Sequence, residues 1–155
     1  GVQPDIRLPS AISPEEVGES SRDGALPWNR IRAARFQPDG TLTPLVADLQ
    51  QRHDERAATD PDYRHAVAEI ASFERMRSQK SVSLNLEKRR AERASMTDNQ
   101  LARENERRVA MGEEPLETAT EIKETPDAML AEAAQITADL TQVEPRYIAR
   151  SRPDG

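Results

Sequence analysis

Three times along the chain, a threonine or an aspartate is followed at once by a proline and then by regularly spaced apolar residues. A polar cap followed by proline in the first helical position is a typical helix start. The three pairs are Thr43-Pro44, Asp60-Pro61 and Thr125-Pro126. They predict three helices in distant parts of the chain and indicate a mainly α fold.

The predicted helices cover residues 43–58, 61–79 and 125–144, and Pro145 is expected to end the last one. In each of them apolar residues recur every three or four positions, as one buried helix face requires. The second stripe consists of Tyr63, Val67, Ile70, Phe73 and Met76, and the third of Met129, Ala133, Ile136, Leu140 and Val143. The short connection between the first two helices favours an antiparallel helical hairpin.

The middle of the chain gives a mixed pattern. Between 82 and 86, apolar residues alternate with Ser83 and Asn85, which fits either a short strand or the start of the next helix. Residues 87–94 favour helix, and Thr97 with Gln100 has the spacing of a capping box for a separate helix over 98–111. Gly112 follows as a natural helix end. We therefore expect a small helical domain over 43–111, and about four to five helices in all.

The remaining segments are expected to be extended. Prolines at 4 and 9 favour a β-like arm over residues 1–9, which we interpret as the last strand of a domain that the chain does not contain. Residues 10–42 form an extended linker with Trp28 as an anchor, either in a groove or in the core of this same domain. Residues 112–124 are expected to form a mobile acidic linker, and residues 145–155 are expected to form a basic tail.

Composition sets further limits. Only 35% of the residues are hydrophobic, 3% are aromatic and 32% are charged, so we expect a thin core. The net charge of −6 disfavours nucleic acid as a partner. No apolar run approaches the roughly 18 residues that a membrane span needs. Without cysteine, a disulfide or a cysteine-based zinc site is excluded.

No pattern in the sequence points to catalysis. His53 and His65 belong to different predicted helices, and no convergent ligand set for a metal accompanies them. The acids all lie in polar surroundings, where a carboxyl group keeps an ordinary pKa and makes a poor general acid. The sequence has no Gly-x-Ser-x-Gly or Ser-x-x-Lys motif and no glycine-rich phosphate loop. We assign no catalytic, cofactor-binding or metal-binding residue and no cofactor.

Several short stretches together resemble a known family. They are GVQPDI at 1–6, ALPWNRI at 25–31, His53-x-x-Arg56 followed by Asp60-Pro61, Phe73, Ser83-Leu84-Asn85 and Asn105-Glu106-Arg107. In order and separation they resemble the C-terminal portion of the tail-specific, or carboxy-terminal-processing, serine proteases of Gram-negative bacteria. The resemblance covers most of residues 1–110. It marks eight candidate structural or interface residues, which are Ile6, Trp28, His53, Arg56, Phe73, Asn85, Asn105 and Arg107.

The resemblance implies a periplasmic endopeptidase whose Ser/Lys dyad and PDZ domain lie upstream of this chain. The helical domain would then brace the protease core and shape substrate access. Its partners would be the upstream protease and PDZ domains, protein or peptide substrates, and an adaptor protein. Two other interpretations stay open: an independent helical adaptor or scaffold that binds a protein partner, and a self-contained hydrolase with unrecognised residues.

Overall fold

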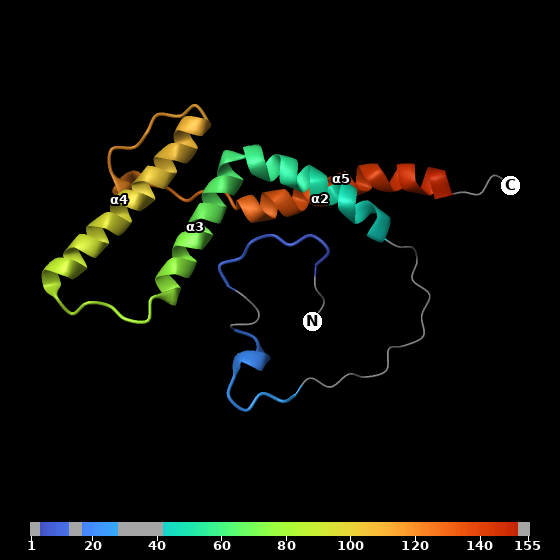
Figure 1. Ribbon diagram of the computed structural model, residues 1–155. Helices are drawn as coiled ribbons and strands as arrows, with labels where there is room; N and C mark the ends of the chain where they lie inside the picture. The colour runs from blue at the N-terminus through green and yellow to red at the C-terminus, as the bar shows by residue number, and fades with distance from the viewer. Residues whose placement is uncertain (1–3, 13–16, 28–41, 152–155) are drawn as a thin grey trace.

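The computed structural model describes residues 4–12, 17–27 and 42–151 (Figure 1). Within these ranges the protein is helical and contains no β-strand. The elements are the 3-10 helices η1 (Glu19–Ser21) and η2 (Ala119–Glu121) and the α-helices α2 (Thr43–Thr59), α3 (Pro61–Ser78), α4 (Leu86–Ala110) and α5 (Ala128–Ser151). The mainly α fold is therefore confirmed, and Trp28 lies outside the described residues.

The helices form two antiparallel pairs. Helix α2 runs beside α5, while α3 runs beside α4, and the start of α3 also contacts α5 (Figure 1). The expected hairpin of the first two helices is wrong, because only Asp60 separates them and the chain bends there. An antiparallel helical hairpin needs a loop of about two to five residues. Helix α2 therefore finds its main partner at the other end of the sequence.

Two of the predicted helix starts need correction. The Asp60 side chain accepts hydrogen bonds from the N–H groups of Asp62 (2.8 Å) and Tyr63 (3.2 Å), as predicted for a cap. Helix α2, however, begins at Thr43 itself, after Leu42, which makes no side-chain cap. Helix α5 begins after Asp127, whose Oδ1 accepts a hydrogen bond from Leu130 N–H at 3.0 Å. Aspartate is a strong capping residue, and as a result the helix begins three residues after the predicted start at Thr125.

Helix α4 is one helix where two were predicted. Its cap is Asn85, whose side chain accepts a hydrogen bond from Lys88 N–H at 3.0 Å. The segment before Leu86 therefore leads into a helix and has no partner strand among the described residues. The capping box at Thr97 is wrong, because the Thr97 hydroxyl donates to the Arg93 carbonyl in the preceding turn (3.1 Å). Gly112, with φ +78°, ends the helix as predicted.

Helix α5 extends further than predicted, because it passes Pro145 and ends at Ser151. A proline inside a helix removes one backbone hydrogen bond and strains the preceding turn, but it need not end the helix. Most of the predicted basic tail is thus part of α5. In the part of the chain that the structure describes, no helix is long and apolar enough to cross a membrane.

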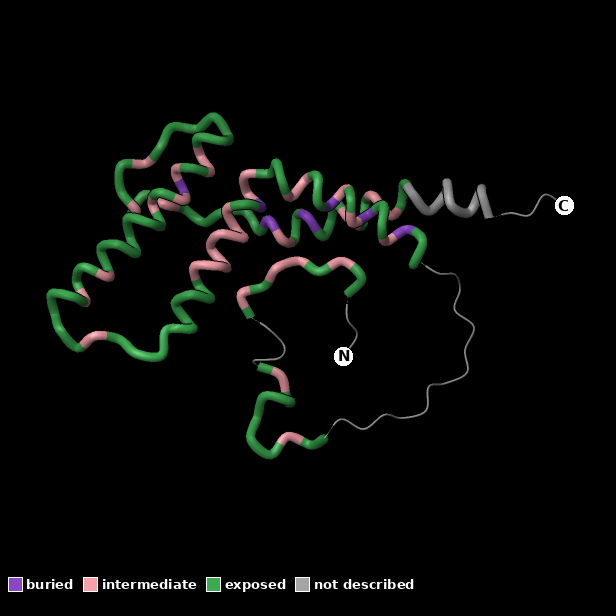
Figure 2. The backbone as a smooth tube through the Cα atoms, viewed as in Figure 1, coloured by how far each residue is buried: buried purple, intermediate pink, exposed green. Residues whose placement is uncertain are grey.

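The apolar core is thin, as predicted, and lies between α2 and α5 (Figure 2). Leu45 and Leu49 are buried there, with Ile6 and Leu140 packed against them. The predicted faces are only partly correct. Ala133 is exposed because the neighbouring Glu132 takes the inward position, and Phe73 and Met76 are exposed near the end of α3.

Candidate functional site

A buried ion-pair cluster joins α2 to α5. We call His53, Arg56, Glu132 and Asp139 the α2–α5 cluster. Glu132 is only 5% exposed, and its Oε1 lies 2.9 Å from His53 Nδ1 and 2.7 Å from Arg56 Nη2. Arg56 Nε also donates to both oxygens of Glu132 at 3.1 Å. Glu132 therefore has three donor atoms around it, which a buried carboxylate needs to offset its desolvation.

Arg56 links two carboxylates of α5. Its Nη1 donates to Asp139 Oδ2 at 2.5 Å, and Arg52 Nη1 donates to Asp139 Oδ1 at 3.1 Å. On the other side of the cluster, the ring of Tyr63 from α3 meets the His53 ring edge-on, with centroids 5.5 Å apart. The α2–α5 cluster thus fixes the register of two helices and brings a third against them.

The charges in this cluster are stabilised as ions. Burial raises the pKa of Glu132, but hydrogen bonds from Arg56 and His53 outweigh it and hold that pKa below the usual value. Burial also raises the pKa of Asp139, but the hydrogen bonds from Arg56 and Arg52 outweigh it, so the pKa of Asp139 is lowered as well. A general acid needs the opposite shift. The two carboxylates therefore stay ionised near neutral pH and hold the helices together.

A second buried cluster joins α3 to α4. We call Asp62, His65, Glu104 and Arg107 the α3–α4 cluster. Glu104 is 3% exposed and receives two hydrogen bonds from Arg107, from Nε at 3.0 Å and from Nη2 at 2.8 Å. Arg107 Nη1 also donates to Asp62 Oδ1 across the helix pair, at 2.6 Å. These hydrogen bonds from Arg107 lower the pKa of Glu104.

The two clusters correct the prediction that all acids lie in polar surroundings. Glu104 and Glu132 are among the most buried residues described, and each is neutralised by an arginine. Sequence reasoning missed both because their partners lie on other helix turns or other helices. One signal was present for Glu132, which stands four residues after Ala128 and four before Ile136, on the inward face of α5.

The N-terminal arm is fastened to the helices at two points. Ile6 packs against the core residues Leu45 and Leu49, and the Ala11 carbonyl accepts a hydrogen bond from Arg77 Nη1 at 3.1 Å. Arg77 lies in the last turn of α3, and its guanidinium stacks over the Phe73 ring at 5.8 Å. Residues 4–12 are therefore held against both helix pairs.

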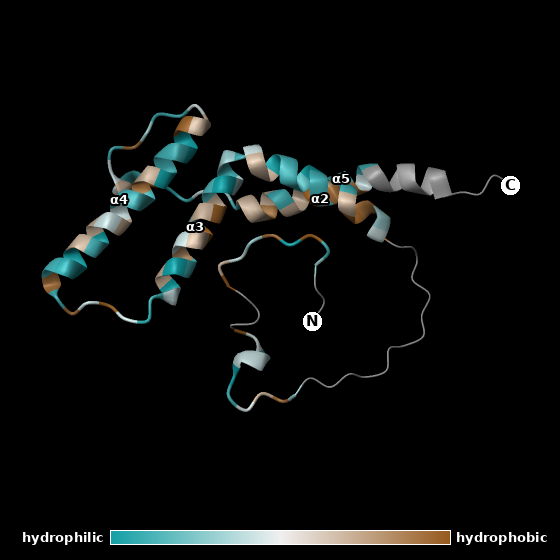
Figure 3. Ribbon diagram, in the orientation of Figure 1, coloured by the Kyte–Doolittle hydropathy of each residue, from teal (hydrophilic) through white to brown (hydrophobic). Residues whose placement is uncertain are grey.

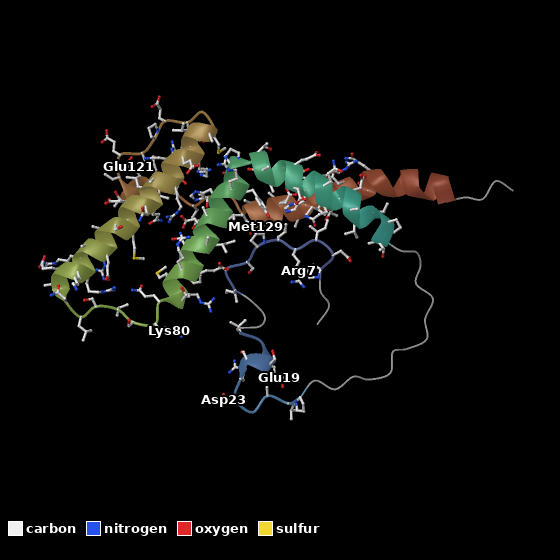
Figure 4. All side chains as sticks on the ribbon, in the orientation of Figure 1. Arg7, Glu19, Asp23, Lys80, Glu121 and Met129 are labelled. Carbon is white, nitrogen blue, oxygen red and sulfur yellow. The ribbon has the colours of Figure 1, made fainter. Side chains whose placement is uncertain are left out.

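The remaining candidate residues lie near the ends of α4. Asn85 caps its start, and Asn105 binds the linker that follows it. Asn105 Nδ2 donates to the Leu116 carbonyl at 2.9 Å, and Leu116 N–H donates to Asn105 Oδ1 at 2.7 Å. With η2 and these two bonds, the linker that contains Glu121 (Figure 4) packs on α4 and is not the free loop that was expected.

The cavity between α3 and α4 has no nucleophilic side chain in its lining. A cavity of about 170 Å³ lies between α3 and α4 and is lined by His65, Arg103, Arg107 and neighbouring residues, with no serine, threonine, cysteine or lysine among them. His65 Nδ1 is buried and has no hydrogen-bond partner within the described residues. No group of three His, Asp or Glu side chains in those residues is arranged to hold a metal ion.

Comparison with known proteins matches the chain both to a protein family and to a curated relative. Residues 12–142 match a family model described as "C-terminal domain of tail specific protease (DUF3340)". The "Tail-specific protease" of Haemophilus influenzae is 32% identical over 145 residues, which are 90% of this chain and 21% of that relative. The chain thus spans about a fifth of the length of the curated relative that it matches.

Proposed function

Since the chain belongs to the family of C-terminal domains of tail-specific proteases, as its motifs predicted, we propose that it is a non-catalytic helical domain that braces a protease core. The catalytic Ser/Lys dyad and the PDZ domain are proposed to lie in the rest of the polypeptide, outside this chain. The resemblance that implies them also implies a periplasmic location. Protein or peptide substrates and an adaptor protein are the further partners that we propose.

The docked arm is the observation that carries the bracing role. The arm contacts the α2 and α5 pair through Ile6 and the end of α3 through Ala11. A movement of the polypeptide before the arm would therefore act on both helix pairs. The two ion-pair clusters make each pair resist such movement, because separating the helices would break the hydrogen bonds of Glu132 to Arg56 and His53 and the hydrogen bond from Arg107 to Asp62.

The surface of the domain suits a role in substrate access. The described helices expose a mixture of charged, polar and small side chains, and the large apolar residues are scattered among them (Figure 3). Such a surface binds an unfolded chain weakly, since affinity for unfolded polypeptides depends on continuous apolar contact. We propose that the domain guides substrates past it and does not retain them.

The test compares two alanine variants of the full-length protease. Glu132→Ala removes the centre of the α2–α5 cluster, while Glu117→Ala removes an exposed carboxylate and is the control. We expect Glu132→Ala to speed amide hydrogen exchange in α5 and to lower the rate of cleavage of an unstructured peptide several-fold. The control should match the wild type in both. Faster exchange in α5 with an unchanged cleavage rate would show that the domain does not brace the protease.

An independent adaptor is the alternative, and it predicts that the arm is dispensable. The contact of Ile6 with the core favours bracing, because the arm completes the apolar cluster of α2 and α5. Removal of residues 1–12 distinguishes the two. The adaptor would keep its fold and its partner, whereas the bracing domain would lose stability and the protease would lose activity.

A further inference from the structure

The connection between α3 and α4 exposes an alternating row of apolar side chains. Leu84 is 98% exposed, and Val82 and Leu86 are more than half exposed. Ser83 between them is half-buried, and residues 79–85 form neither helix nor strand (Figures 2 and 3). Alternation of this kind is the pattern of a strand with one apolar face. Here it occurs in a segment that has no neighbouring strand in the part of the chain that the structure describes.

The backbone of this segment is also unpaired. Ser83 Oγ accepts a hydrogen bond from Asn85 N–H at 3.2 Å, and Asn85 then begins the hydrogen bonding of α4. Within the described residues, no hydrogen bond engages the N–H groups of Val82 and Leu84. In a strand, the N–H groups of residues two apart point to the same edge. Val82 and Leu84 therefore present one free edge, while Asn85 N–H, which points to the other edge, is occupied.

We infer that residues 80–85 are an edge strand that pairs with a strand of the protease core in the same polypeptide. This inference rests on the proposed function. Addition of a strand to an exposed edge is a common recognition mode, in which main-chain hydrogen bonds give affinity and alternate side chains give specificity. The pairing would use the N–H and C=O groups of Val82 and Leu84, and it would cover the most exposed leucine in the described part of the chain.

Two observations favour the protease core as the partner. The chain covers only 21% of its matched relative, so most of such a protein lies outside it. The end of the arm, which is predicted to enter from another domain, is held at Ala11 by Arg77, three residues before Lys80. A surface used only by passing substrates would stay open between encounters, and an open apolar edge favours edge-to-edge aggregation. A partner strand that is always present would keep the edge covered and prevent such aggregation.

Charge indicates the chemistry of that partner strand. Lys80 (Figure 4) and Lys88 flank the segment, and neither forms an ion pair within the described residues. Arg89 and Arg90 lie next to Lys88 and are paired only with exposed glutamates of α4. We therefore expect a partner strand that carries apolar residues facing Val82 and Leu84, and carboxylates near its ends.

Hydrogen exchange at single amides of the full-length protease tests the pairing. With no substrate present, we expect the amides of Val82 and Leu84 to exchange at least about 100-fold more slowly than in an unfolded chain, while the Ser83 amide exchanges freely. Free exchange at all three would overturn the inference. Protection that occurs only after addition of an unstructured peptide would also overturn it, because the partner strand would then be the substrate.

A pair of leucine variants provides the control. Leu84→Asp places a charge in the proposed interface, whereas Leu130→Asp changes a leucine that is 67% exposed on α5. Only Leu84→Asp should remove the protection of the Val82 amide. If both variants leave it unchanged, the pairing is wrong. The bracing role is judged separately by Glu132→Ala, so free exchange at Val82 with an intact Glu132 effect rejects this inference alone.

Discussion

At the scale of single residues, the protein stabilises its helix contacts with buried carboxylates in place of a large apolar core. Glu132 and Glu104 lie where a leucine would be expected, and each needs an arginine to offset its lost hydration. Replacing a buried ion pair with apolar residues is often neutral, but removing one partner of the pair costs several kcal/mol. Such pairs therefore determine which helices contact each other, and their contribution to net stability is small.

This arrangement predicts a sensitivity to acid. The folded-state pKa values of Glu132, Asp139 and Glu104 are lowered, so their contribution to the free energy of unfolding is present above the ordinary carboxyl pKa and is lost as the pH falls through the lowered values. The variant Glu132→Gln removes one of these groups. Near pH 7 it should be less stable than the wild type by about 1–3 kcal/mol, and near pH 3 the difference should shrink.

Urea unfolding of the chain across this pH range measures the effect. Glu117→Gln is the matched control, because the Glu117 side chain is exposed. Parallel stability curves for the wild type and Glu132→Gln at every pH would contradict the account of the α2–α5 cluster.

The sequence could predict which residues matter better than it could predict their partners. His53, Arg56 and Arg107 were selected from motif resemblance, and the structure places all three in buried clusters. Glu132 stands 76 positions from Arg56, and no local spacing links them. Pairing across such a distance depends on the tertiary arrangement of α2 and α5, which helix periodicity alone does not determine.

At the scale of elements, a cap followed by proline predicted where each helix starts to within a few residues, but it did not always predict the capping residue. Asp60 caps α3 as predicted, and Asp62 two residues later is no stronger a cap. Thr125 is followed two residues later by Asp127, which caps better and shifts the start. Within α4 no proline or glycine separates residues 94 and 98, so a strong helix former continues through a pattern that only resembled a start.

The competition between the two caps of α5 can be measured. Asp127→Ala should lower the free energy of unfolding by about 1 kcal/mol, because the Leu130 N–H loses its acceptor. Thr125→Ala should change it by a few tenths of a kcal/mol at most, since Thr125 is exposed outside the helix. Chemical denaturation of the two variants gives the comparison. A larger loss for Thr125→Ala would restore the start predicted from the sequence.

At the scale of the whole molecule, the fold depends on contacts between segments that are distant in the sequence. Helix α5 closes on α2, and the N-terminal arm reaches the same core through Ile6 (Figure 1). The arm was predicted as a strand of another domain, and nothing in the described residues tests that origin. The described part of the arm forms no strand and packs on its own helices, so its apolar residues serve this domain as well.

The arm should therefore detach more often when the contact of Ile6 with the core is weakened. Ile6→Ala removes apolar contact with Leu45 and Leu49, and we expect a loss of about 1–2 kcal/mol in the free energy that holds the arm closed. A loss of that size raises the population of the open arm by roughly 5- to 30-fold. Trypsin cleavage after Arg7 reports this population, because a protease cuts the opened segment. Mass spectrometry of the released peptide measures the rate.

Ile12→Ala is the matched control, because Ile12 is in the same arm but is exposed. It should leave the rate of cleavage after Arg7 close to that of the wild type. Equal rates for both variants would mean that Ile6 does not hold the arm. The hydrogen bond from Arg77 to Ala11 would then be its main attachment, and the arm would transmit force to α3 and not to the α2 and α5 pair.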